Sequence, residues 1–397
     1  MFSALKAKWK SRFTHMAHGG YPLAMIPTTD KFDEGLRTRE LGSRFRTNAS
    51  DEFGQLFAMV EPLAQDMRDQ LVKEVGASKH IPEIFSGVND RSEFDAVADS
   101  LPGGRYIIAV NYGTLILVQD IVHRLFCLPE FFPWVGDPSK EDRTQQFHAT
   151  SDDAQTYMRT FVSDPRPAIP RDPKRKQAAV FLIPLAVMFI VAHEFRHITG
   201  GHLDWLNARS GRMSISEALG IQGDPNAGLF FQALEMDADG FAMYYTLMKA
   251  LVMAESPQEN LPTSLQGIIT TPLQALQAGL ACALVMIGTF FRPPGPPVEW
   301  RSYSHPPSGV RHGLNIVGAD RALRLLGQEE LSLATTSNRE WVSQFASFTF
   351  GHLVQRLGNS DQQDELRLEF GPRGQQHLLE VLNAWGTIKA AVEAFAY

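Results

Sequence analysis

A long apolar segment that runs directly into the pentapeptide HEFRH, at residues 193–197, constrains this chain most. Residues 178–192 are nearly all apolar, and Asp172-Pro173 offers a capping acid followed by a proline suited to a first helical turn. The Gly200-Gly201 pair then offers a stop. We therefore predict one buried helix that begins at Pro173 and carries the pentapeptide at its C-terminal end.

The two histidines of the pentapeptide are spaced to bind one metal ion. Helical positions four apart differ by about 40° around the axis, so His193 and His197 can reach the same ion. Glu194, one step round the helix, then faces the open coordination position, where it can accept a proton from the metal-bound water. The pattern predicts one Zn²⁺ per chain, with His193 and His197 as ligands and Glu194 as general base.

A zinc site of this kind needs a third protein ligand, and His202 is one candidate. The longer pattern HExxHxxGxxH requires its last histidine at position 203, which is Leu203, so His202 comes one residue early. On a continued helix His202 would also point away from His193. We therefore do not favour it.

Glu235 is the favoured third ligand. It belongs to the run EMDAD at residues 235–239, on a second predicted helix that starts at Asp224-Pro225. Glu235 and Asp239 share one face of that helix, so Glu235 can bind the metal while Asp239 accepts the free ring N–H of a ligand histidine. The plainer alternative is a solvated acidic face, on which Asp237 is an ordinary surface acid.

Three motifs in this order resemble a known group of metallopeptidases. HEFRH and EMDAD are followed by His305-Pro306 and Arg311, which match the element HPxxxxR of the gluzincin peptidases of the HtpX / CAAX prenyl protease family and its soluble relatives. The resemblance covers about residues 175–320 and implies a zincin-like metallopeptidase core. It implies the same ligands, base and supporting acid: His193, His197, Glu235, Glu194 and Asp239.

The same resemblance suggests roles for the third motif. His305 and Arg311 would lie near the open zinc position, where a cation or an imidazole stabilises an oxyanion. His305 could instead cap the zinc in a closed resting state. A proline-rich loop with incidental polar residues is the plainer reading of both.

A second group is also similar to this chain. The Lit-type phage-exclusion peptidases, cytoplasmic bacterial enzymes that act on a folded host protein, share a short-spaced HExxH and an acidic helix. Only residues 198–234 separate His197 from Glu235, which is few for the membrane members of the HtpX / CAAX prenyl protease family.

We predict a mainly α (α+β) chain in three parts. Residues 1–165 form an additional helical N-terminal region of unknown role, in which the apolar run 106–128 reads as a strand followed by a helix. A proline-rich connector near residue 165 leads to the metallopeptidase core at 166–320. Residues 321–397 form a C-terminal helical extension packed on that core.

Composition narrows the partners and the compartment. The net charge of −7 and the lack of a dense basic stripe argue against nucleic acid as a main partner. Cys127 and Cys282 lie far apart in apolar stretches, which fits a reducing, cytoplasmic setting. Segments 178–192 and 272–291 read as buried core helices, so membrane association is not favoured.

These observations favour a zinc-dependent endopeptidase that acts on a protein or peptide substrate. Two alternatives stay open: a zinc-stabilised non-catalytic binding or sensor protein on a peptidase scaffold, and a membrane-associated quality-control protease.

Overall fold

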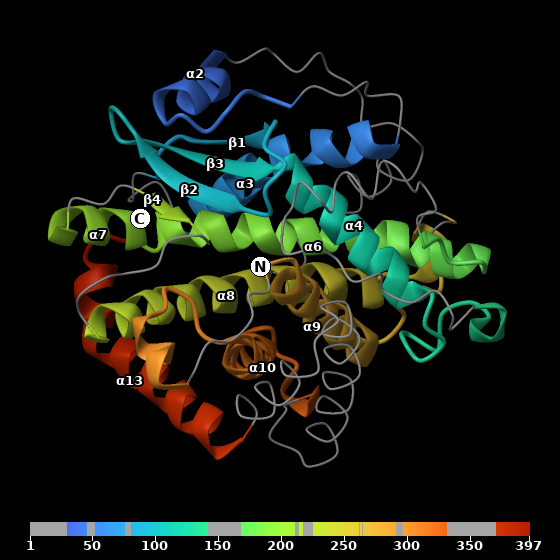
Figure 1. Cartoon of the computed structure of the whole chain (residues 1–397). Coiled ribbons are helices and arrows are strands. Elements are labelled where there is room, and N and C mark those ends of the chain that lie inside the picture. The colour runs from blue at the N-terminus through green and yellow to red at the C-terminus, as the bar shows by residue number, and fades with distance from the viewer. Residues whose placement is uncertain are drawn as a thin grey trace.

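Helices dominate the described part of the chain. The computed structural model describes residues 30–45, 52–75, 81–141, 168–210, 214–216, 225–261, 263, 265–290, 297–331 and 371–397. Its α-helices are α2 (Asp30–Thr38), α3 (Glu52–Val75), α4 (Tyr112–Phe126), α6 (Pro173–Thr199), α7 (His202–Ser210), α8 (Pro225–Ala254), α9 (Pro272–Thr289), α10 (Ser308–Leu325) and α13 (Pro372–Glu393). The mainly α prediction is confirmed (Figure 1).

A small mixed sheet lies in the N-terminal part. Strands β1 (Ile84–Asn89), β2 (Ala96–Leu101), β3 (Arg105–Asn111) and β4 (Ser214–Ser216) follow the order β1-β3-β2-β4. β1 is parallel to β3, whereas β2 is antiparallel to both β3 and β4. The strand and helix predicted for residues 106–128 are confirmed by β3 and α4. The description of residues 1–165 as helical needs correction, because three of the strands lie within it.

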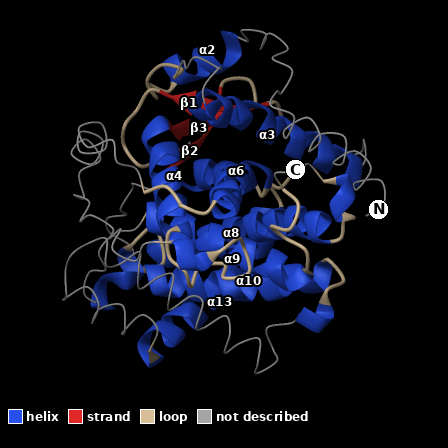
Figure 2. Ribbon diagram, turned by 90° about the vertical axis from the view of Figure 1, so that its right-hand side faces the viewer, coloured by secondary structure: helices blue, strands red, loops and turns tan. Residues whose placement is uncertain are grey.

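The two faces of the sheet pack on different helices. Ile107 and Ala109 of β3 form a small cluster with Phe32 and Leu36 of α2 on one face. The residues of β3 that alternate with Ile107 and Ala109 point to the other face of the sheet. They join the main core there, where α3 and α6 lie (Figure 2). This alternation follows from the two-residue period of a strand. The sheet is therefore a layer between α2 and the helical body.

Helix α6 runs through the middle of the fold and ends in the pentapeptide (Figure 1). The Asp172 side chain accepts hydrogen bonds from the backbone N–H groups of Lys174 and Arg175 at 2.9 and 3.1 Å, and Pro173 occupies the first turn. These contacts satisfy donors that a helix start otherwise leaves unpaired. The predicted start of this helix is confirmed.

Arg175 fixes the N-terminal end of α6 to the chain that follows α4. Its buried guanidinium donates to five backbone carbonyl groups, those of Phe126, Leu128, Phe131, Phe132 and Val135, over 2.8–3.2 Å. A guanidinium has five N–H donors, so one side chain organises this whole loop. Glu141 lies 3.5 Å from the same guanidinium and supplies the opposite charge.

One hydrophobic core runs through all three predicted parts of the chain. It includes Met59 of α3, Phe195 of α6 and Val381 of α13. The proposed boundary near residue 165 lies outside the described residues, and the division into parts stays a prediction. Helix α13 (Pro372–Glu393) lies in the C-terminal extension, where a helix was expected, and packs against α8 and α10.

Two helices, α6 and α9, have the length and apolar composition of membrane spans. Their most apolar windows are 89% and 83% buried inside the protein. Both helices thus lie in the core, as the sequence analysis expected.

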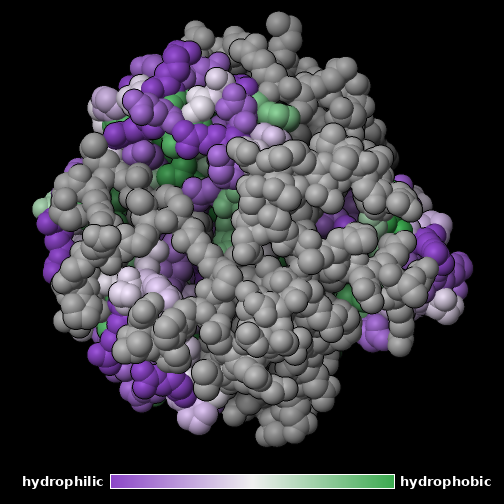
Figure 3. All heavy atoms as spheres, in the orientation of Figure 1, coloured by the Kyte–Doolittle hydropathy of each residue, from purple (hydrophilic) through white to green (hydrophobic). Residues whose placement is uncertain are grey.

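On the face seen in Figure 3, the described residues above the sheet are mostly hydrophilic at the surface.

Both cysteines are free, buried thiols, which agrees with their positions in apolar stretches of the sequence. Burial raises the pKa of Cys127 to about 12 and that of Cys282 well above its ordinary value. Neither thiol is therefore a reactive group at neutral pH.

Candidate metal centre

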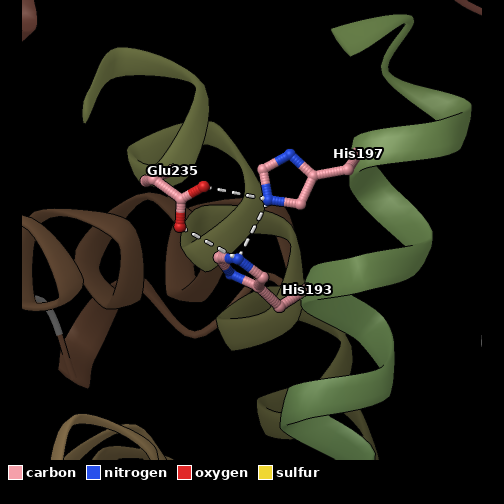
Figure 4. Close-up of side chains that lie close together, drawn as sticks. All are labelled: His193, His197 and Glu235. Atoms are coloured by element: carbon pink, nitrogen blue, oxygen red, sulfur yellow. Dashed lines mark hydrogen bonds and ion pairs between the residues drawn. The ribbon is translucent and has the colours of Figure 1, made fainter. Parts of the chain in front are cut away.

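Two neighbouring helices bring His193, His197 and Glu235 together, as predicted. The histidines project from one face of α6 and the carboxylate from α8, and all three point at a common centre (Figure 4). The Nε2 atoms of the two rings are 3.0 Å apart, and each lies 3.2 Å from one oxygen of Glu235. None of the three side chains is more than 3% exposed. This buried group can hold a metal ion.

The carboxylates of Glu235 and Asp239 dominate the electrostatics around His193. Burial lowers the pKa of His193, but Glu235 and Asp239 outweigh burial and raise it well above its ordinary value. Burial raises the pKa of Glu235, but His305, His197 and His193 outweigh it and lower that pKa well below its ordinary range. The two carboxylates thus stabilise a positive charge at His193.

The pKa of His197 moves the other way. Burial lowers it to about 4, against the weaker attraction of Glu235. A neutral imidazole has a free nitrogen lone pair, which is the form that binds a metal.

Asp239 supports His193 from behind, as predicted. Its Oδ1 lies 2.8 Å from the Nδ1 atom of His193, the nitrogen that faces away from Glu235. A neutral His193 that binds a metal through Nε2 must carry its proton on Nδ1, so the bond fixes the required tautomer. The spacing of EMDAD therefore places a candidate ligand, Glu235, and a carboxylate that contacts His193 on one face of α8.

Arg311 lies beside the candidate metal group, and its guanidinium is directed at the acids of α8. Its Nε and Nη2 atoms donate to the two oxygens of Asp239 at 2.9 and 3.0 Å, and Nη2 also lies 3.4 Å from Glu235. Asn315, one turn along α10, donates to Asp239 at 3.1 Å. Arg311 and Asn315 thus fix the position of the Asp239 carboxylate, which in turn contacts His193.

Replacing Arg311 with methionine should weaken the metal site. Asp239 would lose its bidentate partner in a buried setting, and removal of such a supporting contact typically costs about 10- to 100-fold in metal affinity. Competition with a chromogenic zinc chelator measures this loss. Arg324→Met is the matched control, because Arg324 lies on the same helix, is 60% exposed and pairs with Asp320. Equal affinities for the two variants would contradict the supporting role.

Glu194 is buried on α6 beside His193, with 3% exposure. It does not belong to the three-residue group that can hold the ion. A neighbouring carboxylate that is not itself a ligand is what a general base in such a site requires. Its role as the base stays a prediction.

His305 lies at the edge of the same group, near the position that the third motif suggested. Its Nε2 is 3.2 Å from Glu235, its Nδ1 is 2.9 Å from the hydroxyl of Ser304, and its side chain is 15% exposed. It is more exposed than the three candidate ligands. His305 therefore faces the metal group from the less buried side.

His202 is close to the site but is not in the ligand group. Its Nδ1 lies 3.0 Å from the Nδ1 of His197, on the side of that ring opposite to Glu235. Helix α6 ends at Thr199, and Gly201 has a φ of +78°, so the chain turns before α7 begins. His202 thus approaches from a separate helix, a geometry that continuing α6 could not predict.

Asp237 is not the surface acid that the plainer alternative supposed. Its side chain is only 13% exposed and pairs with Arg196 at 2.6 Å and with His202 at 3.3 Å. The sequence analysis missed it because Asp237 is two residues from Glu235 and so points to another side of α8.

The donor set fits a zinc ion. Two imidazole nitrogens and one carboxylate oxygen are ligands that Zn²⁺ accepts in catalytic sites.

Comparison with protein-family models, with curated proteins and with solved structures found no match for this chain.

Proposed function

We propose that this chain is a zinc-dependent endopeptidase of the gluzincin type. The observation that carries the proposal is the buried group of His193, His197 and Glu235. Glu194 lies on the same helix as the two histidines, directly after His193. A structural zinc site usually fills all four positions with protein ligands and has no need of an adjacent base. Similarity to the HtpX / CAAX prenyl protease motifs supports the same reading.

Zn²⁺, when bound, would polarise the substrate carbonyl and lower the pKa of the attacking water. Glu194 would accept a proton from that water and deliver it to the leaving amine. Asp239, held by Arg311, would keep His193 in its metal-binding tautomer. His305, on the less buried side, would donate a hydrogen bond to the oxyanion that forms from the carbonyl.

The substrate we propose is a protein or peptide, and the proposed compartment is the cytoplasm. The two free, buried cysteines support this compartment.

Metal analysis of the purified full chain tests the proposal. We expect one zinc per chain, and we expect Glu235→Ala to lose it. Chelation should also lower the melting temperature, because an ion at 100 times its Kd stabilises the folded state by about 2.7 kcal/mol. Glu255→Ala, an exposed change directly after the end of α8, should keep the metal. A chain that binds no zinc would refute the proposal.

A cleavage assay separates the endopeptidase from the alternative binding or sensor protein. The zinc-loaded chain is incubated with an unfolded, fluorescently labelled protein, and fragments are followed over time. Stoichiometric zinc without any cleavage of proteins or peptides would favour the non-catalytic alternative.

A further inference from the structure

His197, the second candidate metal-binding histidine, also has a buried polar neighbour at its Nδ1 atom. That neighbour is His202 of α7, whereas the neighbour of His193 is Asp239 of α8. The Nδ1 of His197 meets the Nδ1 of His202 at 3.0 Å, and the Nε2 of His202 lies 3.3 Å from Oδ2 of Asp237. Arg196 donates to the same oxygen at 2.6 Å. His197 and His202 are both fully buried. The four side chains form a continuous polar chain that leads away from the metal group.

The proton positions along this chain follow from the chemistry of imidazole. If His197 binds a metal through Nε2, its Nδ1 must carry the proton and donate it. The Nδ1 of His202 must then be the acceptor, so His202 carries its own proton on Nε2, toward Asp237. The Asp237 carboxylate lies 3.3 Å from that nitrogen, and it accepts a hydrogen bond from Arg196. The tautomers of His197 and His202 thus follow from metal binding through Nε2 of His197.

Backbone geometry and packing fix His202 in this place. The turn at Gly201 would not accept a side chain, because a Cβ there would come within 2.6 Å of the backbone of Phe395. The His202 ring also meets the Trp385 ring of α13 edge-on, with centroids 6.3 Å apart. The start of α7 and the C-terminal helix thus hold His202 against His197.

We propose that His202 and Asp237 are positioning residues of the metal centre, which fix the tautomer and orientation of His197 as Asp239 does for His193. This inference rests on the proposed function. It assigns a supporting role to Asp237 and to His202. The sequence analysis considered His202 only as an alternative metal ligand. Neither residue would touch substrate or metal.

Zinc affinity of the full-length protein tests the assignment. The probe is Zn²⁺ alone, in competition with a chromogenic chelator. His202→Leu should lower the affinity by roughly 10- to 100-fold, the usual effect of losing such a support. His202→Asn should stay within a few-fold of wild type, because its amide oxygen can accept the bond at the place of Nδ1. A role in packing alone would not give this rescue.

The control is His123→Leu, which removes another buried histidine. His123 lies one turn before Phe126, whose carbonyl group is bonded to Arg175 at the opposite end of α6, so this variant should bind zinc normally. If His202→Leu does not fold, Asp237→Asn carries the same prediction with a smaller, several-fold loss, since it keeps the shape of the side chain.

The outcomes separate the two claims. A wild-type chain that binds no zinc would overturn the proposed function and this inference with it. Tight zinc binding by wild type and equally tight binding by His202→Leu would overturn the inference alone. Equal losses in the Leu and Asn variants would also overturn it, because the hydrogen bond would then not be the cause.

Discussion

Glu194→Gln is expected to abolish peptide cleavage while the protein keeps its metal. Glutamine has the shape of glutamate but cannot accept a proton, and loss of a general base typically costs about 10²- to 10⁴-fold in rate. Metal content should not change, because the group that can hold the ion is His193, His197 and Glu235. The measurement compares new protein N-termini in cells that express the wild-type chain with those in cells that express the variant, alongside zinc analysis of both purified proteins.

Glu83→Gln is the matched control for this experiment. Glu83 pairs with Lys31 on the surface, its side chain is 53% exposed, and its loss should leave both cleavage and zinc content intact. A Glu194→Gln protein that still cleaves at the full rate would refute the base assignment. Loss of zinc from that variant would instead make Glu194 a part of the metal site itself.

The main helices, and the pairs of site residues that share one helix face, were predictable because local rules decide them. A capping acid and a proline set the start of α6 at Pro173, and the four-residue spacing of His193 and His197 puts both rings on one face. The same spacing joins Glu235 to Asp239 on α8. Each of these inferences needs only the geometry of a single helix.

The supporting residues could not be predicted in this way, because their contacts join separate elements. His202 reaches His197 only after the chain has turned at Gly201, and a helical projection across that turn is meaningless. The partner of Arg311 depends on how α10 packs against α8, which no spacing encodes. Asn315 is the exception, since its place four residues after Arg311 puts it on the same face.

The first two strands were missed for a different reason. β1 reads IFSGVN and β2 reads AVADSL, and both are largely buried on their two faces. A strand with two buried faces loses the alternation of polar and apolar residues that marks a half-exposed one. Small and polar residues such as Gly87 and Asp99 weaken the signal further. Tertiary packing against α2, α3 and α6 therefore decides that these two segments form strands.

Arg175→Met is expected to destabilise the whole protein, by about 3–5 kcal/mol, without touching the metal site. Methionine fills much of the same volume, but five backbone carbonyl groups between Phe126 and Val135 would lose their donor inside the protein, and Glu141 would lose its opposite charge. Each buried group left unpaired carries a desolvation cost of its own. Urea unfolding followed by circular dichroism, in the presence of a zinc chelator, measures the change.

Arg175→Lys should destabilise nearly as much as Arg175→Met, because an ammonium has three donors and cannot span carbonyl groups that the planar guanidinium reaches from three nitrogens. Lys176→Met is the matched control, since Lys176 is the next residue, is exposed, and should shift stability by no more than about 0.5 kcal/mol. If Arg175→Lys matched wild type, the charge of the side chain and not its hydrogen-bonding geometry would organise the loop. If Arg175→Met matched wild type, the loop would be held by packing of Phe131 and Phe132 against Phe126 alone.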